Sequence, residues 1–95
     1  MSESREHKNA FTQAVDLVKE RYRTASGDRM TSASLQHLLG CSHAWFYRCM
    51  QSGTTSLPTA LRLEVLTDKE FRWQDLVEPS VKDDILRVKD RVETL

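Results

Sequence analysis

Apolar residues recur at intervals of three and four along most of this chain, the spacing that gives an α-helix one apolar face. The first such stripe consists of Phe11, Ala14, Val15, Val18, Tyr22 and Ala25. The Ser26-Gly27-Asp28 segment that follows is typical of a helix end. We therefore expect a first helix from about Arg5 to Ala25.

Residues 34–53, SLQHLLGCSHAWFYRCMQSG, contain two short apolar stripes separated by one glycine. The first stripe consists of Leu35, Leu38 and Leu39, and Thr31 or Ser32 can cap its helix. The second consists of Phe46, Cys49 and Met50. Between them, Gly40 suits a tight turn, because such turns often need a positive φ. We expect the second of these helices to run from the N-cap Ser42 to about Gln51.

The pattern after Gly53 predicts two more helices. Ser56 can cap a helix that has Pro58 in its first turn and ends near Leu66. Its candidate core residues are Leu57, Ala60, Leu61, Val65 and Leu66. A brief fifth helix is expected around residues 72–77, with Trp73 as a core aromatic. Glu78-Pro79-Ser80 then marks a boundary.

Residues 80–95 form an amphipathic helix with a heptad-like stripe. The stripe residues are Val81, Ile85, Val88, Val92 and Leu95, and charged residues cover the other faces. A sixteen-residue helix is marginal alone, so the stripe must be buried on its own domain or on the same helix of a second protomer. We favour the second protomer, because the break at Pro79 follows what reads as a complete five-helix domain. The prediction is an all-α fold, with a domain at 5–79 and an oligomerisation helix at 80–95.

The face of helix 42–51 opposite its apolar stripe carries hydrogen-bonding and aromatic groups but no acid. Its residues are His43, Ala44, Trp45, Tyr47, Arg48 and Gln51. The recognition helix of a helix-turn-helix needs this distribution, because one side packs on the domain while the other reads base edges in the major groove.

The motif LxxLLGCSxxxFYRC, which starts at Leu35, resembles the Leu-x-x-x-Leu-Gly-Val-Ser-x-x-x-Val-x-x-Trp core of Cro/cI-type phage repressors and YdaS-like regulators. The likeness extends through LPTALRLEVLTDKEFRWQDLVEP and covers Ala33–Pro79. It implies a five-helix, Cro/cI-like domain that regulates transcription. Such a regulator, typically a repressor of phage, prophage or toxin–antitoxin type, binds a palindromic double-stranded DNA operator as a homodimer.

This interpretation assigns roles to individual residues. Candidates for base contacts are His43, Ala44, Trp45, Tyr47 and Arg48. Candidates for phosphate contacts are Ser32, Ser42, Gln51, Thr54 and Thr55. Arg48 suits guanine, and Ala44 suits a thymine methyl group. Trp45 is expected to flank the groove or to pack against the preceding helix.

Charge qualifies the DNA-binding interpretation. The 95 residues carry a formal net charge of zero, which argues against simple phosphate neutralisation. The distribution is uneven, however, because residues 29–63 contain no acid and nine of the fourteen acids lie from Glu64 onward. The acid-free segment coincides with the motif and contains Arg29, Arg48 and Arg62.

Several other classes of function are disfavoured. The polar MSESREHKN segment is no signal peptide, and no apolar run has membrane-spanning length, so we expect a cytoplasmic protein with no membrane contact. Two cysteines make no disulfide framework. The spacing H-x3-C-x-H-x5-C of His37, Cys41, His43 and Cys49 matches no established zinc pattern. Without a nucleophile elbow or a phosphate-binding glycine loop, we expect neither an enzyme nor a cofactor.

Two alternatives stay open. In one, the helix-turn-helix is a scaffold, and the protein is an interaction module such as an antitoxin or adaptor whose C-terminal helix binds another protein. The exposed aromatic surface of Trp45 suits that role. In the other, the protein resembles a CII-like phage activator and forms a tetramer through its last helix.

Overall fold

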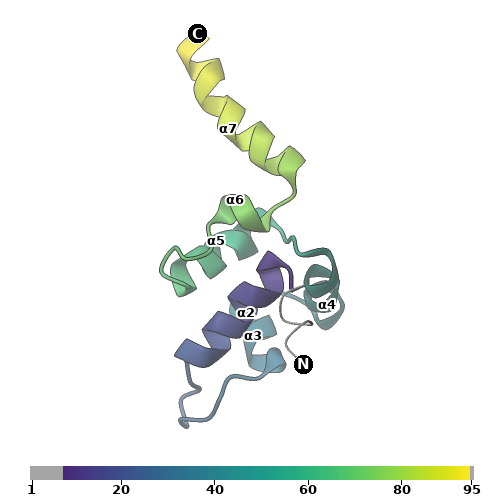
Figure 1. The fold of residues 1–95 in the computed structure, drawn as a ribbon, viewed down its shortest axis with the longest axis vertical. Coiled ribbons are helices and arrows are strands. Elements are labelled where there is room, and N and C mark those ends of the chain that lie inside the picture. Colours follow the sequence, from purple (N-terminus) through teal and green to yellow (C-terminus); the bar gives the residue numbers. More distant parts are fainter. Residues whose placement is uncertain (1–7, 95) are drawn as a thin grey trace.

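The computed structural model describes residues 8–94, and within them the chain forms six helices and no strand (Figure 1). The helices are α2 (Ala10–Arg21), α3 (Ser32–Leu39), α4 (His43–Ser52), α5 (Leu57–Leu66), α6 (Trp73–Leu76) and α7 (Pro79–Thr94). The predicted all-α class is confirmed for this part of the chain.

Helices α2 to α6 pack around one hydrophobic core. Helix α2 is central, because it contacts α4, α5 and α6, while α3 lies against α4 and α5. The buried apolar residues are Phe11, Ala14, Val15, Val18, Leu35, Leu39, Phe46, Cys49, Ala60, Leu63, Leu76 and Val77. Each large side chain among them contributes about 1.5–3 kcal/mol by leaving water. Trp73 is half-buried against this cluster, in agreement with its expected place as a core aromatic.

Helix α2 is shorter than the sequence predicts. The Asn9 side chain accepts a hydrogen bond from the Thr12 amide at 2.9 Å and starts the helix at Ala10. At the other end, Tyr22 adopts an extended conformation, and Arg23 pairs with Arg29 in an isolated antiparallel bridge. The prediction that Tyr22 and Ala25 continue the buried stripe is therefore wrong, and both side chains are exposed. The predicted start near Arg5 lies outside the described residues.

Three leucine and valine side chains predicted for the core lie on the surface. Leu38 and Leu61 are each 43% exposed, and Val65 is 72% exposed. On α3, Leu35 and Leu39 take the inward face; on α5, Ala60 and Leu63 do so. The three exposed side chains point away from those pairs and, with Arg62 and Leu66, line a shallow groove between α3 and α5.

The last two helices differ in how they are held. Helix α6 is fixed by hydrogen bonds from the Trp73 amide to Glu64 Oε1 at 2.8 Å and from the Thr55 amide to the Leu76 carbonyl at 2.8 Å. Helix α7 instead projects from the domain (Figure 1). No helix in the described part of the chain is long and apolar enough to span a bilayer.

Candidate nucleic-acid interface

The turn between α3 and α4 is fixed by contacts from α5. Gly40 has φ +72°, a left-handed conformation that is energetically unfavourable for a residue with a Cβ atom. The Leu39 carbonyl just before it accepts hydrogen bonds from Arg62 Nη1 at 2.9 Å and from the Thr59 hydroxyl at 3.3 Å. These bonds satisfy a carbonyl at the end of α3 and set the direction in which α4 leaves it.

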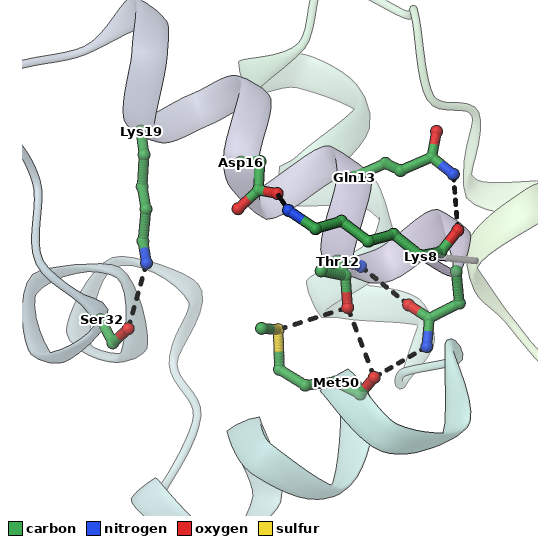
Figure 2. Close-up of polar contacts among 8 residues, drawn as sticks. Lys8, Thr12, Gln13, Asp16, Lys19, Ser32 and Met50 are labelled. Atoms are coloured by element: carbon green, nitrogen blue, oxygen red, sulfur yellow. Dashed lines mark hydrogen bonds and ion pairs between the residues drawn. The ribbon is translucent and has the colours of Figure 1, made fainter. Parts of the chain in front are cut away.

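The far end of α4 is anchored to the start of α2 (Figure 2). The Met50 carbonyl accepts hydrogen bonds from Asn9 Nδ2 at 2.7 Å and from the Thr12 hydroxyl at 3.3 Å. Gly53 ends α4 with φ +82°, and a Cβ atom there would lie 2.8 Å from Asn9 Cβ. The turn before α4 and the last turn of α4 are thus each held by polar contacts with other elements.

Between these two anchors, α4 turns a polar and aromatic face to solvent. The Ser42 hydroxyl caps the helix by accepting a hydrogen bond from the Trp45 amide at 3.1 Å. Phe46 and Cys49 point into the core. The exposed side chains are those expected from the sequence: His43, Ala44, Trp45, Tyr47, Arg48 and Gln51. None of them is acidic, so this face offers a cation, an amide and ring groups to a ligand.

A row of aromatic rings connects the core to this face. Phe11 meets Phe46 edge-on at 5.9 Å between ring centroids, and Phe46 meets Tyr47 edge-on at 5.6 Å. The His43 ring lies 4.7 Å from that of Tyr47. Edge-to-face pairs of this kind each add about 0.5–1.5 kcal/mol beyond burial of area. They restrict Tyr47, which is 44% exposed, and hold its ring in place on the surface.

Trp45 and Arg48 form a second pair on the same face. The Arg48 guanidinium lies 5.9 Å from the centre of the Trp45 ring, a cation–π geometry worth about 0.5–1 kcal/mol at an exposed site. Both residues border a cleft of about 320 Å³ that Glu78 and Val81, at the start of α7, also line. Trp45 therefore lies toward the α7 side of α4, where its ring limits the freedom of the Arg48 side chain.

The phosphate candidates lie at both ends of the α3–α4 pair. Ser32 begins α3, and its hydroxyl accepts a hydrogen bond from Lys19 Nζ at 3.1 Å (Figure 2). Gln51 is exposed in the last turn of α4. Thr54 is half-buried, and its hydroxyl lies 3.3 Å from that of Ser52. These groups and the Ser42 cap flank the exposed face of α4.

Thr55 is the exception among the phosphate candidates. It is only 8% exposed, and its hydroxyl oxygen accepts a hydrogen bond from the Cys49 thiol at 3.3 Å. Because its side chain is turned into the core, the predicted contact between the Thr55 hydroxyl and phosphate is wrong. Thr55 instead secures the loop after α4.

Lys19 is a candidate that the site prediction did not include. Its ammonium group reaches the first turn of α3, near Thr31, whose hydroxyl accepts a hydrogen bond from the Ser34 amide at 3.1 Å. The result is a cation beside a helix N-terminus, an arrangement suited to phosphate. Lys19 and Ser32 are separated by an irregular connection, so no spacing rule pairs them.

The cysteines and histidines do not gather into a metal site in the described part of the chain. Within residues 8–94, no three His, Cys, Asp or Glu side chains lie close enough together to hold an ion. Cys49 is 1% exposed, and this burial raises the pKa of its thiol, although the hydrogen bond to Thr55 opposes the shift. Cys41 is a half-buried thiol in the α3–α4 turn.

No family model, curated protein or solved structure matches this chain.

Proposed function

We propose that the protein is a sequence-specific DNA-binding regulator of Cro-like type, which inserts α4 into the major groove. The observation that carries this proposal is the acid-free, exposed face of α4, held between the Gly40 turn and the Asn9 anchor. A helix that reads bases needs a rigid mount and outward groups that match base edges.

The residues of α4 divide by their chemistry. Arg48 pairs with a guanine edge, its guanidinium already ordered by Trp45. Ala44 meets a thymine methyl group, while His43 and Tyr47 contact a base or phosphate beside it. Ser32, Ser42, Gln51, Thr54 and Lys19 contact the backbone on either side of the groove. As a homodimer, the protein places two α4 helices at half-sites about one helical turn apart and blocks a promoter.

Some acids of the described residues are paired with cations away from α4. Asp16 pairs with Lys8 at 2.6 Å, and Arg21 pairs with Glu70 and Asp68. Arg48 is the cation on the exposed face of α4, and Lys19 lies beside the first turn of α3. A net charge of zero therefore predicts modest affinity for DNA in general rather than none.

The test is selection of binding sites from random duplex DNA, followed by affinity measurements on the selected site. We expect affinity to fall at least about tenfold between about 50 and 200 mM salt, because phosphate contacts release counterions. Arg48→Ala should lose about 1–3 kcal/mol of discrimination at one base pair. Arg72→Ala, an exposed arginine outside the face, is the matched control and should bind normally.

A second function, a protein-interaction module such as an antitoxin or adaptor, is favoured by two exposed apolar surfaces. Trp45 is 38% exposed, and the stripe of α7 is also open to solvent. If the protein is such a module, we expect no enrichment of any DNA sequence and no steep dependence of DNA affinity on salt. If a site is selected, equal binding of Arg48→Ala and Arg72→Ala to it would remove Arg48 from base recognition.

A further inference from the structure

Helix α7 carries an apolar stripe that the domain leaves open. Val81 is 37% exposed, Val88 54% and Val92 63%, and Ile85 is half-buried. None of these residues belongs to the hydrophobic core of α2 to α6. The fifth predicted stripe residue, Leu95, lies outside the described residues. A helix of this length spans about 24 Å and is marginal without a partner, so the stripe calls for one.

The side chains that flank the stripe have an uneven distribution of charge. With Ile85 and Val92 at the first apolar heptad position and Val81 and Val88 at the second, one flank carries Lys82 and Lys89. The other flank carries Asp84 and Arg91. In two-stranded coiled coils, the residues at these flanks face one another across the helices and set partner and orientation.

The two orientations of a self-paired α7 place different charges together. In a parallel pair, Asp84 of one helix faces Lys89 of the other, and symmetry provides this contact twice. In an antiparallel pair, Asp84 of one helix faces Arg91 of the other, but the lysine flanks also meet. Lys82 of one helix then faces Lys89 of the other, and this repulsion offsets the attraction. Like charges at such positions oppose association.

We propose that the partner of α7 is the α7 of a second copy of this chain, in a parallel two-stranded coiled coil. The inference deepens the dimeric part of the proposed function and rests on it. Parallel pairing places both Pro79 residues at the same end of the coil, so both domains lie on one side of it. The two α4 helices can then reach neighbouring half-sites on one duplex.

One intrahelical ion pair competes only weakly with this arrangement. Arg87 lies 3.8 Å from Asp84, and the two side chains are 64% and 79% exposed. Pairs so exposed add little to stability. The Asp84 carboxylate has room to accept a second cation from across the coil.

The test measures the dimer dissociation constant of full-length variants by sedimentation equilibrium, without DNA. Lys89→Asp should weaken a parallel dimer about tenfold, because two attractive contacts become repulsive. The double variant Asp84→Lys/Lys89→Asp restores opposite charges and should recover most of that loss. Asp90→Lys, a charge reversal on the opposite side of α7, is the control and should leave the dimer unchanged.

Three results would overturn the proposal. A tighter dimer for Lys89→Asp would indicate antiparallel pairing, because the new aspartate would face Lys82 of the partner helix. A wild-type chain that stays monomeric up to about 100 μM would exclude functional self-pairing, since that concentration far exceeds a useful dissociation constant. A dimer that survives Val88→Asp is held by a surface other than the α7 stripe. These measurements use no DNA, so a protein that fails to bind DNA would give the same results.

Discussion

Helices α2 and α7 have the same apolar periodicity but opposite surroundings. In α2, Phe11, Val15 and Val18 are fully buried against α4, α5 and α6. In α7, Val88 and Val92 remain more than half exposed. Periodicity therefore determines which face of a helix is apolar, whereas tertiary structure determines what covers that face. The apolar face of α2 is covered within the chain, whereas the stripe of α7 is left open.

The largest expected effect is the difference in free energy of unfolding between a substitution in the core and one in α7. Phe46→Ala removes a fully buried ring that contacts Phe11, and should lower the free energy of unfolding by about 3–5 kcal/mol. Val88→Ala should change it by less than about 0.5 kcal/mol, because the side chain is 54% exposed and lies outside the hydrophobic core. Urea denaturation measures both.

Both denaturation curves should be recorded at concentrations where the protein is monomeric, because dimerisation would stabilise the native state by mass action. A loss of more than about 1 kcal/mol for Val88→Ala under those conditions would place α7 against the domain and end the contrast between the two regions.

A second pair of variants tests how tightly α4 is held. Gly53→Ala combines a positive φ with a Cβ atom 2.8 Å from Asn9, and should cost about 2 kcal/mol. Gly27→Ala has a similar φ of +87° but no atom within 4 Å, and should cost about 1 kcal/mol. Thermal unfolding of the two variants isolates the contribution of the close approach. Equal costs would show that Asn9 moves aside freely.

The smallest effect concerns the α3–α4 turn. Arg62→Met removes the hydrogen bond to the Leu39 carbonyl and should cost about 1 kcal/mol. Arg72→Met alters an exposed arginine and should stay within about 0.5 kcal/mol. Chemical denaturation gives both values. If Arg62→Met proves as mild as Arg72→Met, the turn is determined by Gly40 and local caps alone.

Much of the helical architecture could be predicted from local sequence. Gly40 and Gly53 have positive φ where the pattern predicts helix ends, and Ser42 caps α4 as expected. The exposed face of α4 also follows from the positions of Phe46 and Cys49, because a helix has a fixed geometry. These features depend on residues a few positions apart.

The remaining features depend on distant contacts that no local rule contains. The Asn9 anchor joins residues 41 positions apart, and Lys19 reaches Ser32 across an irregular connection. Thr55 is polar and lies in a loop, which predicts exposure, yet Cys49 and α6 draw it inward. Leu38 and Val65 are apolar, which predicts burial, yet neither faces the core.

The contact between Asn9 and the end of α4 couples local unfolding at two remote places. To expose the Met50 carbonyl, the protein must break the hydrogen bonds from Asn9 and Thr12, which also define the first turn of α2. The last amides of α4 and the first amides of α2 should therefore exchange with solvent deuterium as one cooperative unit. In these terms, the start of α2 controls how long the end of α4 stays folded.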